Sequence, residues 1–149
     1  MKTLVKAFVL CTLTCVAFTS RAQIVNSSRP TLFKNVSASF AVTTMELDKA
    51  FIVKEGSQVQ LNFANNFTFS GVVVSSVQRY GKLSNIIIKS PNLHNTLLSI
   101  SRRVNDDNSV SYVGRILNEG YADGYELKQG SDGKYAFHKI KTEDLIQDY

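Results

Sequence analysis

Alternation of apolar and polar residues runs through most of this chain and constrains its fold more than any other feature. In one segment Val59, Leu61 and Phe63 alternate with polar neighbours, which is the period of a strand with one buried face. Similar short segments follow almost to the end of the chain. The pattern predicts strands over 32–42, 58–63, 67–80, 83–90, 97–104, 109–117, 125–129 and 134–141.

Clusters of turn-forming residues separate these segments. They include Asn65-Asn66, the polar run at 105–108 and Gly130-Ser131-Asp132-Gly133, of which Asp132-Gly133 is the strongest hairpin signal. Gly71 lies inside the longest segment, where we expect a bulge or bend. Short strands joined by turns predict a mainly β fold, an antiparallel β-sandwich or open barrel of about seven or eight strands with one or two short helices.

Two segments predict helix. Thr43 precedes Glu46 by three residues, which is the capping-box pattern, and Leu47, Ala50 and Phe51 follow at helical spacing. A strand is the competing interpretation because Phe51-Ile52-Val53 is aromatic and β-branched. A last helical turn is expected at 142–144.

The first 22 residues have the features of a secretory signal peptide. Lys2 and Lys6 give a basic start, an apolar run extends over 7–18, and Ser20-Arg21-Ala22 offers small residues at a cleavage site. We therefore expect cleavage before Gln23, a flexible leader over 23–31, a single β-rich domain over 32–149, and a secreted protein in the extracellular space, periplasm or cell envelope. The cysteines, Cys11 and Cys15, lie inside the signal, so the exported chain is expected to fold without a disulfide.

The charge balance does not favour a polyanionic partner. Lys2, Lys6 and Arg21 leave with the signal, so 17 basic residues become 14 against 12 acidic ones, and the net charge falls from +5 to +2. Arg102-Arg103 is followed at once by Asp106-Asp107. Because nucleic acids require a clustered basic footprint, we expect no nucleic-acid partner. We also expect no membrane span once the signal is cleaved.

No residue pattern indicates catalysis or a cofactor. His94 and His138 belong to no metal-ligand motif, and the serines lack the Gly-x-Ser-x-Gly elbow of hydrolases. The acidic run at 105–108 lacks the central glycine of a calcium loop and is better explained as a hairpin turn. The prediction is no catalytic residue, no metal ligand and no cofactor.

Tyrosine is the residue type that suggests an interaction surface. Tyr121 and Tyr125 flank Ala122-Asp123-Gly124, a loop of the kind that often carries function, and rigid amphipathic rings are favoured at interfaces. These two residues are the predicted partner-binding residues. The alternative is that they are ordinary half-buried strand residues.

The last third of the chain resembles a known protein family. Tyr112-Val113-Gly114-Arg115-Ile116, Tyr125-Glu126-Leu127 and Tyr135-Ala136-Phe137 after the Asp132-Gly133 turn resemble the closing strands of propeptide domains that precede reprolysin-type metallopeptidases. The resemblance covers at most 56–140 and is shared with small exported bacterial β-proteins of unassigned function. This chain departs from the propeptide pattern because it has no cysteine after Gln23 that could block a zinc ion. The resemblance implies no catalytic residue.

These observations predict an exported, non-catalytic β-domain that binds a protein or peptide, as an inhibitor or a propeptide would. One alternative is a structural or surface-assembly protein that associates through its edge strands. A third is an enzyme whose acid and base residues converge from distant loops.

Overall fold

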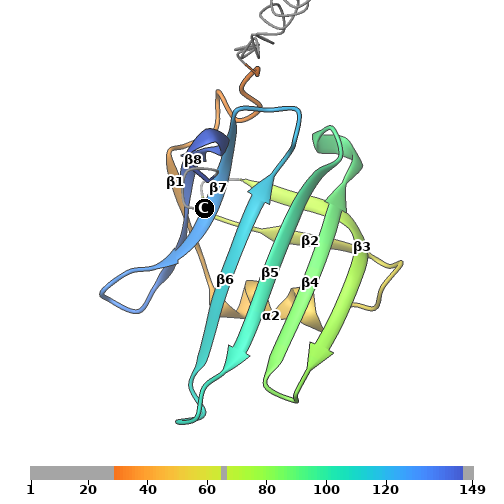
Figure 1. The fold of residues 1–149 in the computed structure, drawn as a ribbon, viewed down its shortest axis with the longest axis vertical. Coiled ribbons are helices and arrows are strands. Elements are labelled where there is room, and N and C mark those ends of the chain that lie inside the picture. Colours follow the sequence, from red (N-terminus) through yellow and green to blue (C-terminus); the bar gives the residue numbers. More distant parts are fainter. Residues whose placement is uncertain (1–28, 65–66, 146–149) are drawn as a thin grey trace, which may run out of the picture.

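The computed structural model describes residues 29–64 and 67–145. Within these ranges the chain forms eight strands, one α-helix and two 3-10 helices (Figure 1). The predicted signal peptide and residues 23–28 of the predicted leader lie outside the described residues. The elements are β1 (Ser39–Val42), α2 (Thr44–Phe51), β2 (Gln58–Asn62), β3 (Thr68–Arg79), β4 (Leu83–Ser90), η1 (Pro91–Leu93), β5 (Thr96–Val104), β6 (Val110–Leu117), β7 (Asp123–Gln129), β8 (Tyr135–Lys141) and η2 (Thr142–Leu145).

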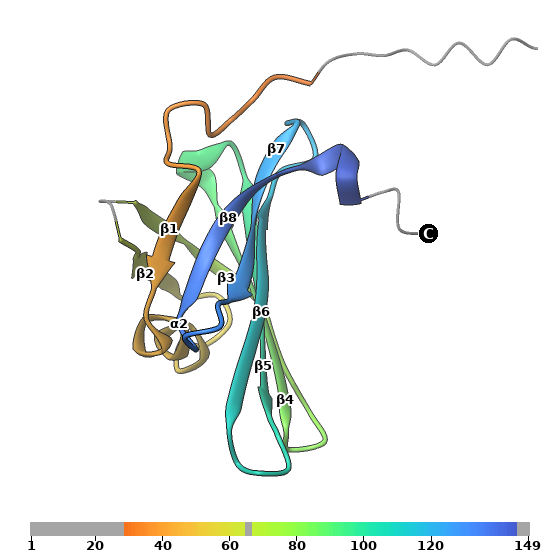
Figure 2. The same cartoon turned by 90° about the vertical axis from the view of Figure 1, so that its left-hand side faces the viewer.

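All eight strands belong to one antiparallel sheet in the order β1-β8-β7-β6-β5-β4-β3-β2. From β2 to β8 every strand pairs with the next one in the sequence, and β1 then pairs with β8. The sheet curls into an open half-barrel (Figure 2), which brings the edge strands β1 and β2 towards each other. This arrangement confirms the predicted mainly β fold and selects the open barrel over the sandwich.

The concave face of the sheet holds the core. Alternate residues of each strand point inward, as their burial shows, and α2 adds Leu47 and Ala50, which are fully buried. Aromatic rings fill the end nearest β1, where Phe40 contacts Phe63 at 5.6 Å and Phe137 at 5.4 Å between ring centroids. The largest buried side chains are Tyr125, Phe33, Phe40, Phe69, Phe137, Leu47, Leu61, Ile86, Ile88, Leu98, Ile100 and Ile116.

The helix forms where the capping pattern predicts it. Thr43 is the N-cap, and its Oγ1 accepts a hydrogen bond from Glu46 N at 3.2 Å. The side chain of Glu46 does not return to the N-cap. Its Oε1 accepts a hydrogen bond from Asn62 N of β2 at 2.7 Å. Glu46 therefore fixes the helix against the sheet.

Two local predictions are wrong. Residues 32–38 are not strand, since β1 begins only at Ser39. The irregularity in β3 falls between Val73 and Ser75, not at Gly71, which pairs regularly with Val59. Glycine is needed at position 71 for another reason: a Cβ there would lie 2.8 Å from Ile88 Cγ2, closer than packed atoms allow.

Candidate functional site

The seam between β1 and β2 is the first candidate site. Each of these strands has a neighbour in the sheet on one side only. Ala64 N, just after β2, donates to Ala41 O of β1 at 3.0 Å. This contact and the aromatic cluster bring the two edges together without completing a ladder of paired strands.

The outer edge of β2 presents backbone groups that pair with no other strand in the described part of the chain. Phe63 N donates to Phe67 O at 2.8 Å, so the N–H and C=O groups of Phe63 face β3. Because these groups alternate in direction along an antiparallel strand, those of Gln58, Gln60 and Asn62 face away from β3. The Asn62 N–H meets Glu46 as described above. The N–H and C=O groups of Gln58 and Gln60 face away from the sheet, and both residues are exposed.

A groove lies at the end of this edge. It has a volume of about 640 Å³ and is lined by residues 41–44, 62–64 and 133–135. Its lining includes the apolar or aromatic residues Val42, Phe63 and Tyr135 and the charged residue Lys134. Its residues come from β1, the end of β2 and the start of β8, so an extended segment lying on the edge of β2 would reach it.

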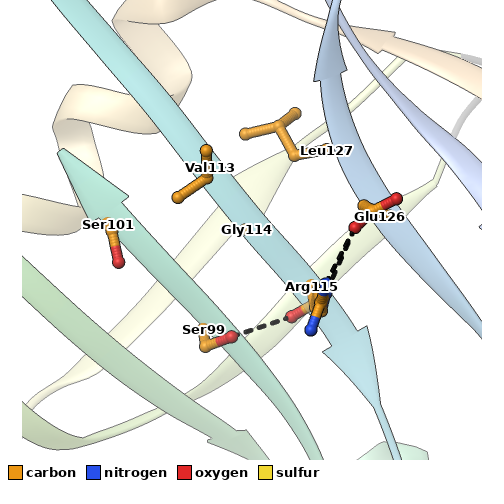
Figure 3. Close-up of a pocket in the computed structure, with 7 residues that line it drawn as sticks. All are labelled: Ser99, Ser101, Val113, Gly114, Arg115, Glu126 and Leu127. Atoms are coloured by element: carbon orange, nitrogen blue, oxygen red, sulfur yellow. Dashed lines mark hydrogen bonds and ion pairs between the residues drawn. The ribbon is translucent and has the colours of Figure 1, made fainter. Parts of the chain in front are cut away.

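The second candidate site is a hollow on the outer, convex face of the sheet (Figure 3). It forms where β6 and β7 separate, because these strands pair only over Gly114–Ile116 and Tyr125–Leu127. The small residues Ser99, Ser101 and Gly114 leave a volume of about 410 Å³. A Cβ on Gly114 would lie 2.8 Å from Ser99 O and 3.6 Å from Cγ1 of the buried Ile100, so the close approach of β5 and β6 under the hollow requires glycine at this position.

Tyr135 contacts β6 on the inner side of the sheet, where β6 and β7 separate. Its hydroxyl accepts a hydrogen bond from Tyr112 N at 3.1 Å. The bond satisfies a backbone donor of β6 that has lost its partner strand, and the two rings pack edge to face with centroids 5.5 Å apart. The separation of β6 and β7 is therefore a built feature of the fold.

Charged side chains border the hollow. Arg115 Nη2 lies 3.0 Å from Glu126 Oε1, and Lys128 Nζ lies 3.1 Å from Glu126 Oε2. The Lys128 ammonium and the Arg115 guanidinium hold the pKa of the Glu126 carboxyl below its ordinary value. Glu126 is thus a paired carboxylate at neutral pH and is poorly suited to act as a general base.

The hydroxyl groups in the hollow are bonded to groups that do not activate them. Ser99 Oγ donates to Arg115 O, and Ser101 Oγ donates to Asn85 Oδ1. A serine nucleophile needs a positioned base such as histidine, and neither hydroxyl has one among the described residues. Both hydroxyl groups therefore act as hydrogen-bond donors within the sheet.

The predicted partner-binding tyrosines occupy different environments. Tyr125 is fully buried, and its hydroxyl donates to Ser37 O at 2.7 Å. Tyr121 is half-buried, and its ring lies 5.8 Å from that of His94. The structure thus places Tyr125 in the core, while contact of either residue with a partner stays a prediction.

A buried carboxylate holds the N-terminal segment in place. Asp123 is 6% exposed and accepts hydrogen bonds from Leu32 N at 2.6 Å and Phe33 N at 2.9 Å. Lys139 Nζ donates to Phe33 O at 2.7 Å and to Val36 O at 2.8 Å. Sequence reasoning missed this clamp because its partners lie about ninety or more positions apart.

Comparisons with protein-family models, curated proteins and solved structures find no match to this chain. Among the described residues, no group of three or more His, Cys, Asp or Glu is placed to hold a metal ion. No helix in the described part of the chain is long and apolar enough to cross a membrane.

Proposed function

We propose that this chain is an exported, non-catalytic β-domain that binds an extended segment of a protein or peptide along the open edge of β2. The observation that carries the proposal is the combination of an unpaired strand edge with an apolar groove at its end. In binding by strand addition, backbone hydrogen bonds supply affinity and a pocket for alternate side chains supplies specificity.

The edge offers both components. Gln58 and Gln60 present N–H and C=O groups outward, which an antiparallel partner strand would satisfy. The groove beside Phe63 would then receive an apolar side chain of the same segment. Export rests on the signal-peptide features at the N-terminus of the sequence.

A backbone substitution tests this proposal. Proline at Gln60 removes the outward N–H without touching the bonds between β2 and β3, so Gln60→Pro should keep the fold. Gln60→Thr is the matched control, since it removes the same side chain and keeps the N–H. The probe is the tightest peptide selected from a random peptide library displayed on phage.

We expect Gln60→Pro to weaken binding of the selected peptide by at least about tenfold, and Gln60→Thr to change it little. Equal affinity of the two variants would show that the peptide binds elsewhere. If no peptide is selected and the purified protein forms oligomers that Gln60→Pro dissociates, the edge serves self-association instead.

A further inference from the structure

The outer face of β3–β7 carries an excess of positive charge. The strand registers place five basic side chains on this face and one acidic side chain, Glu126. The basic residues are Arg79, Lys89, Arg103, Arg115 and Lys128. Arg115 and Lys128 share Glu126, so even this pairing leaves a positive charge over.

The other three cations have no acidic partner within 29–64 and 67–145. Arg79, Lys89 and Arg103 are exposed and make no ion pair with any residue that the structure describes. Cations that stabilise a fold by pairing would lie near carboxylates of their own chain. These three point outward and are available to a carboxylate from another molecule.

Apolar side chains lie among these cations. Lys89 lies between Val72 and Leu97 in the sheet register. Leu97 is 40% exposed and Val113 is 64% exposed, and Val113 forms one wall of the hollow beside Gly114 (Figure 3). A surface that combines exposed apolar groups with unpaired charges is typical of an interaction site.

We infer that this outer face is a second binding surface, for an acidic protein segment whose apolar side chain enters the hollow beside Gly114. Charge complementarity selects the partner, since carboxylates would pair with Arg103, Lys89 and Arg79. The apolar side chains between these cations favour a protein segment over a nucleic-acid backbone, which would leave them uncovered.

Synthetic peptides provide the probes. The first alternates glutamate with leucine, the second lysine with leucine, and the third glutamate with serine. Each is titrated into isotope-labelled protein and followed by shifts of backbone amide resonances. We expect only the glutamate-leucine peptide to bind, with the largest shifts at Ser99, Val113 and Arg115.

Charge reversal supplies the matched variants. Lys89→Glu combined with Arg103→Glu should weaken binding of the glutamate-leucine peptide by at least about tenfold. The control Lys54→Glu makes the same kind of change at an exposed loop residue off this face and should change the affinity less than about twofold. Gln60→Pro should leave this affinity unchanged, which separates the inference from the proposal for the edge of β2.

Several results would overturn the inference. One is an equal loss of affinity for the glutamate-leucine peptide in Lys54→Glu and in the double variant. Another is that this peptide does not bind, and a third is that one of the other two peptides binds equally well. Binding of the glutamate-serine peptide would indicate attraction to any polyanion. Capture by phosphatidylserine vesicles without binding of the glutamate-leucine peptide would assign the face to a membrane surface.

Discussion

The Tyr125 side chain joins the aromatic core to the N-terminal segment. Its ring lies 5.0 Å from that of Phe33 and 4.8 Å from that of Phe40, and its hydroxyl bonds to Ser37 O. Tyr125→Ala should therefore lower the free energy of unfolding by about 3–5 kcal/mol. Tyr125→Phe should cost about 1 kcal/mol because it removes only the hydrogen bond, and Tyr121→Ala should cost less than Tyr125→Ala.

Urea denaturation of the three variants measures these differences. A Tyr125→Ala variant as stable as the wild type would mean that the ring is not part of the core. The residue type of Tyr125 and its position in a strand are visible in the sequence. Its burial is not, because residues 33, 37 and 40 cover it only after the N-terminal segment docks.

Buried tyrosines should also make the fold sensitive to alkali. Burial and a hydrogen bond to the Asp48 carboxylate raise the pKa of Tyr112 from 10.0 to about 12. Burial and the charge of Asp123 raise the pKa of Tyr125 from 10.0 to about 12. A raised folded-state pKa means that the folded protein keeps the phenol proton while the unfolded chain releases it.

The stability contributed by these two phenols is therefore complete below pH 10 and is lost as the pH rises to about 12. Urea denaturation across this range measures the loss, and the Tyr112→Phe/Tyr125→Phe double variant should lose less than the wild type. Equal losses would mean that lysines and other groups account for the alkaline sensitivity.

At the scale of elements, the β7–β8 hairpin depends on a glycine. Gly133 has φ +77°, a conformation that side chains with a Cβ rarely adopt. The turn also contains a bond from Gly130 N to Lys134 O at 2.8 Å. Gly133→Val should lower the free energy of unfolding by about 1 kcal/mol or more. Gly120→Val is a comparison variant, because that loop glycine is exposed and has no positive φ.

Thermal melts of the two variants provide the test, and an unchanged midpoint for Gly133→Val would show that the turn tolerates a side chain. Hairpins such as this one were predictable because the signal is local: a period of two on each side of a turn. The predicted 83–90 segment coincides with β4. The pairing of β1 with β8 was not predictable, since it joins residues that lie almost a hundred positions apart.

At the scale of the molecule, residues 30–38 act as a strap across one end of the half-barrel. Pro30 O accepts from Ala122 N at 2.9 Å, and Asp123 and Lys139 bind the segment from the sheet. Asp123→Asn should lower the free energy of unfolding by about 1–3 kcal/mol, because one buried carboxylate oxygen that accepts an N–H is replaced by a donor. Asp106→Asn, at a side chain that is 98% exposed, should change it little.

Urea denaturation compares the two variants, and equal stabilities would exclude the clamp as a source of stability. The fold class followed from the alternating pattern, whereas the choice of an open barrel over a sandwich did not. That choice depends on sheet curvature, on α2 covering the concave face and on the strap closing one end. All three features depend on residues that are far apart in the sequence, so they leave no local pattern in it.

Amide hydrogen exchange of the protein bound to its selected peptide tests the central claim most directly. If an extended segment adds to the edge of β2, the Gln60 and Gln58 amides should become protected on binding. The amides of Leu61 and Val59 face β3 by the same alternation and should change little. Unchanged exchange at Gln58 and Gln60 in a saturated complex would contradict strand addition at this edge.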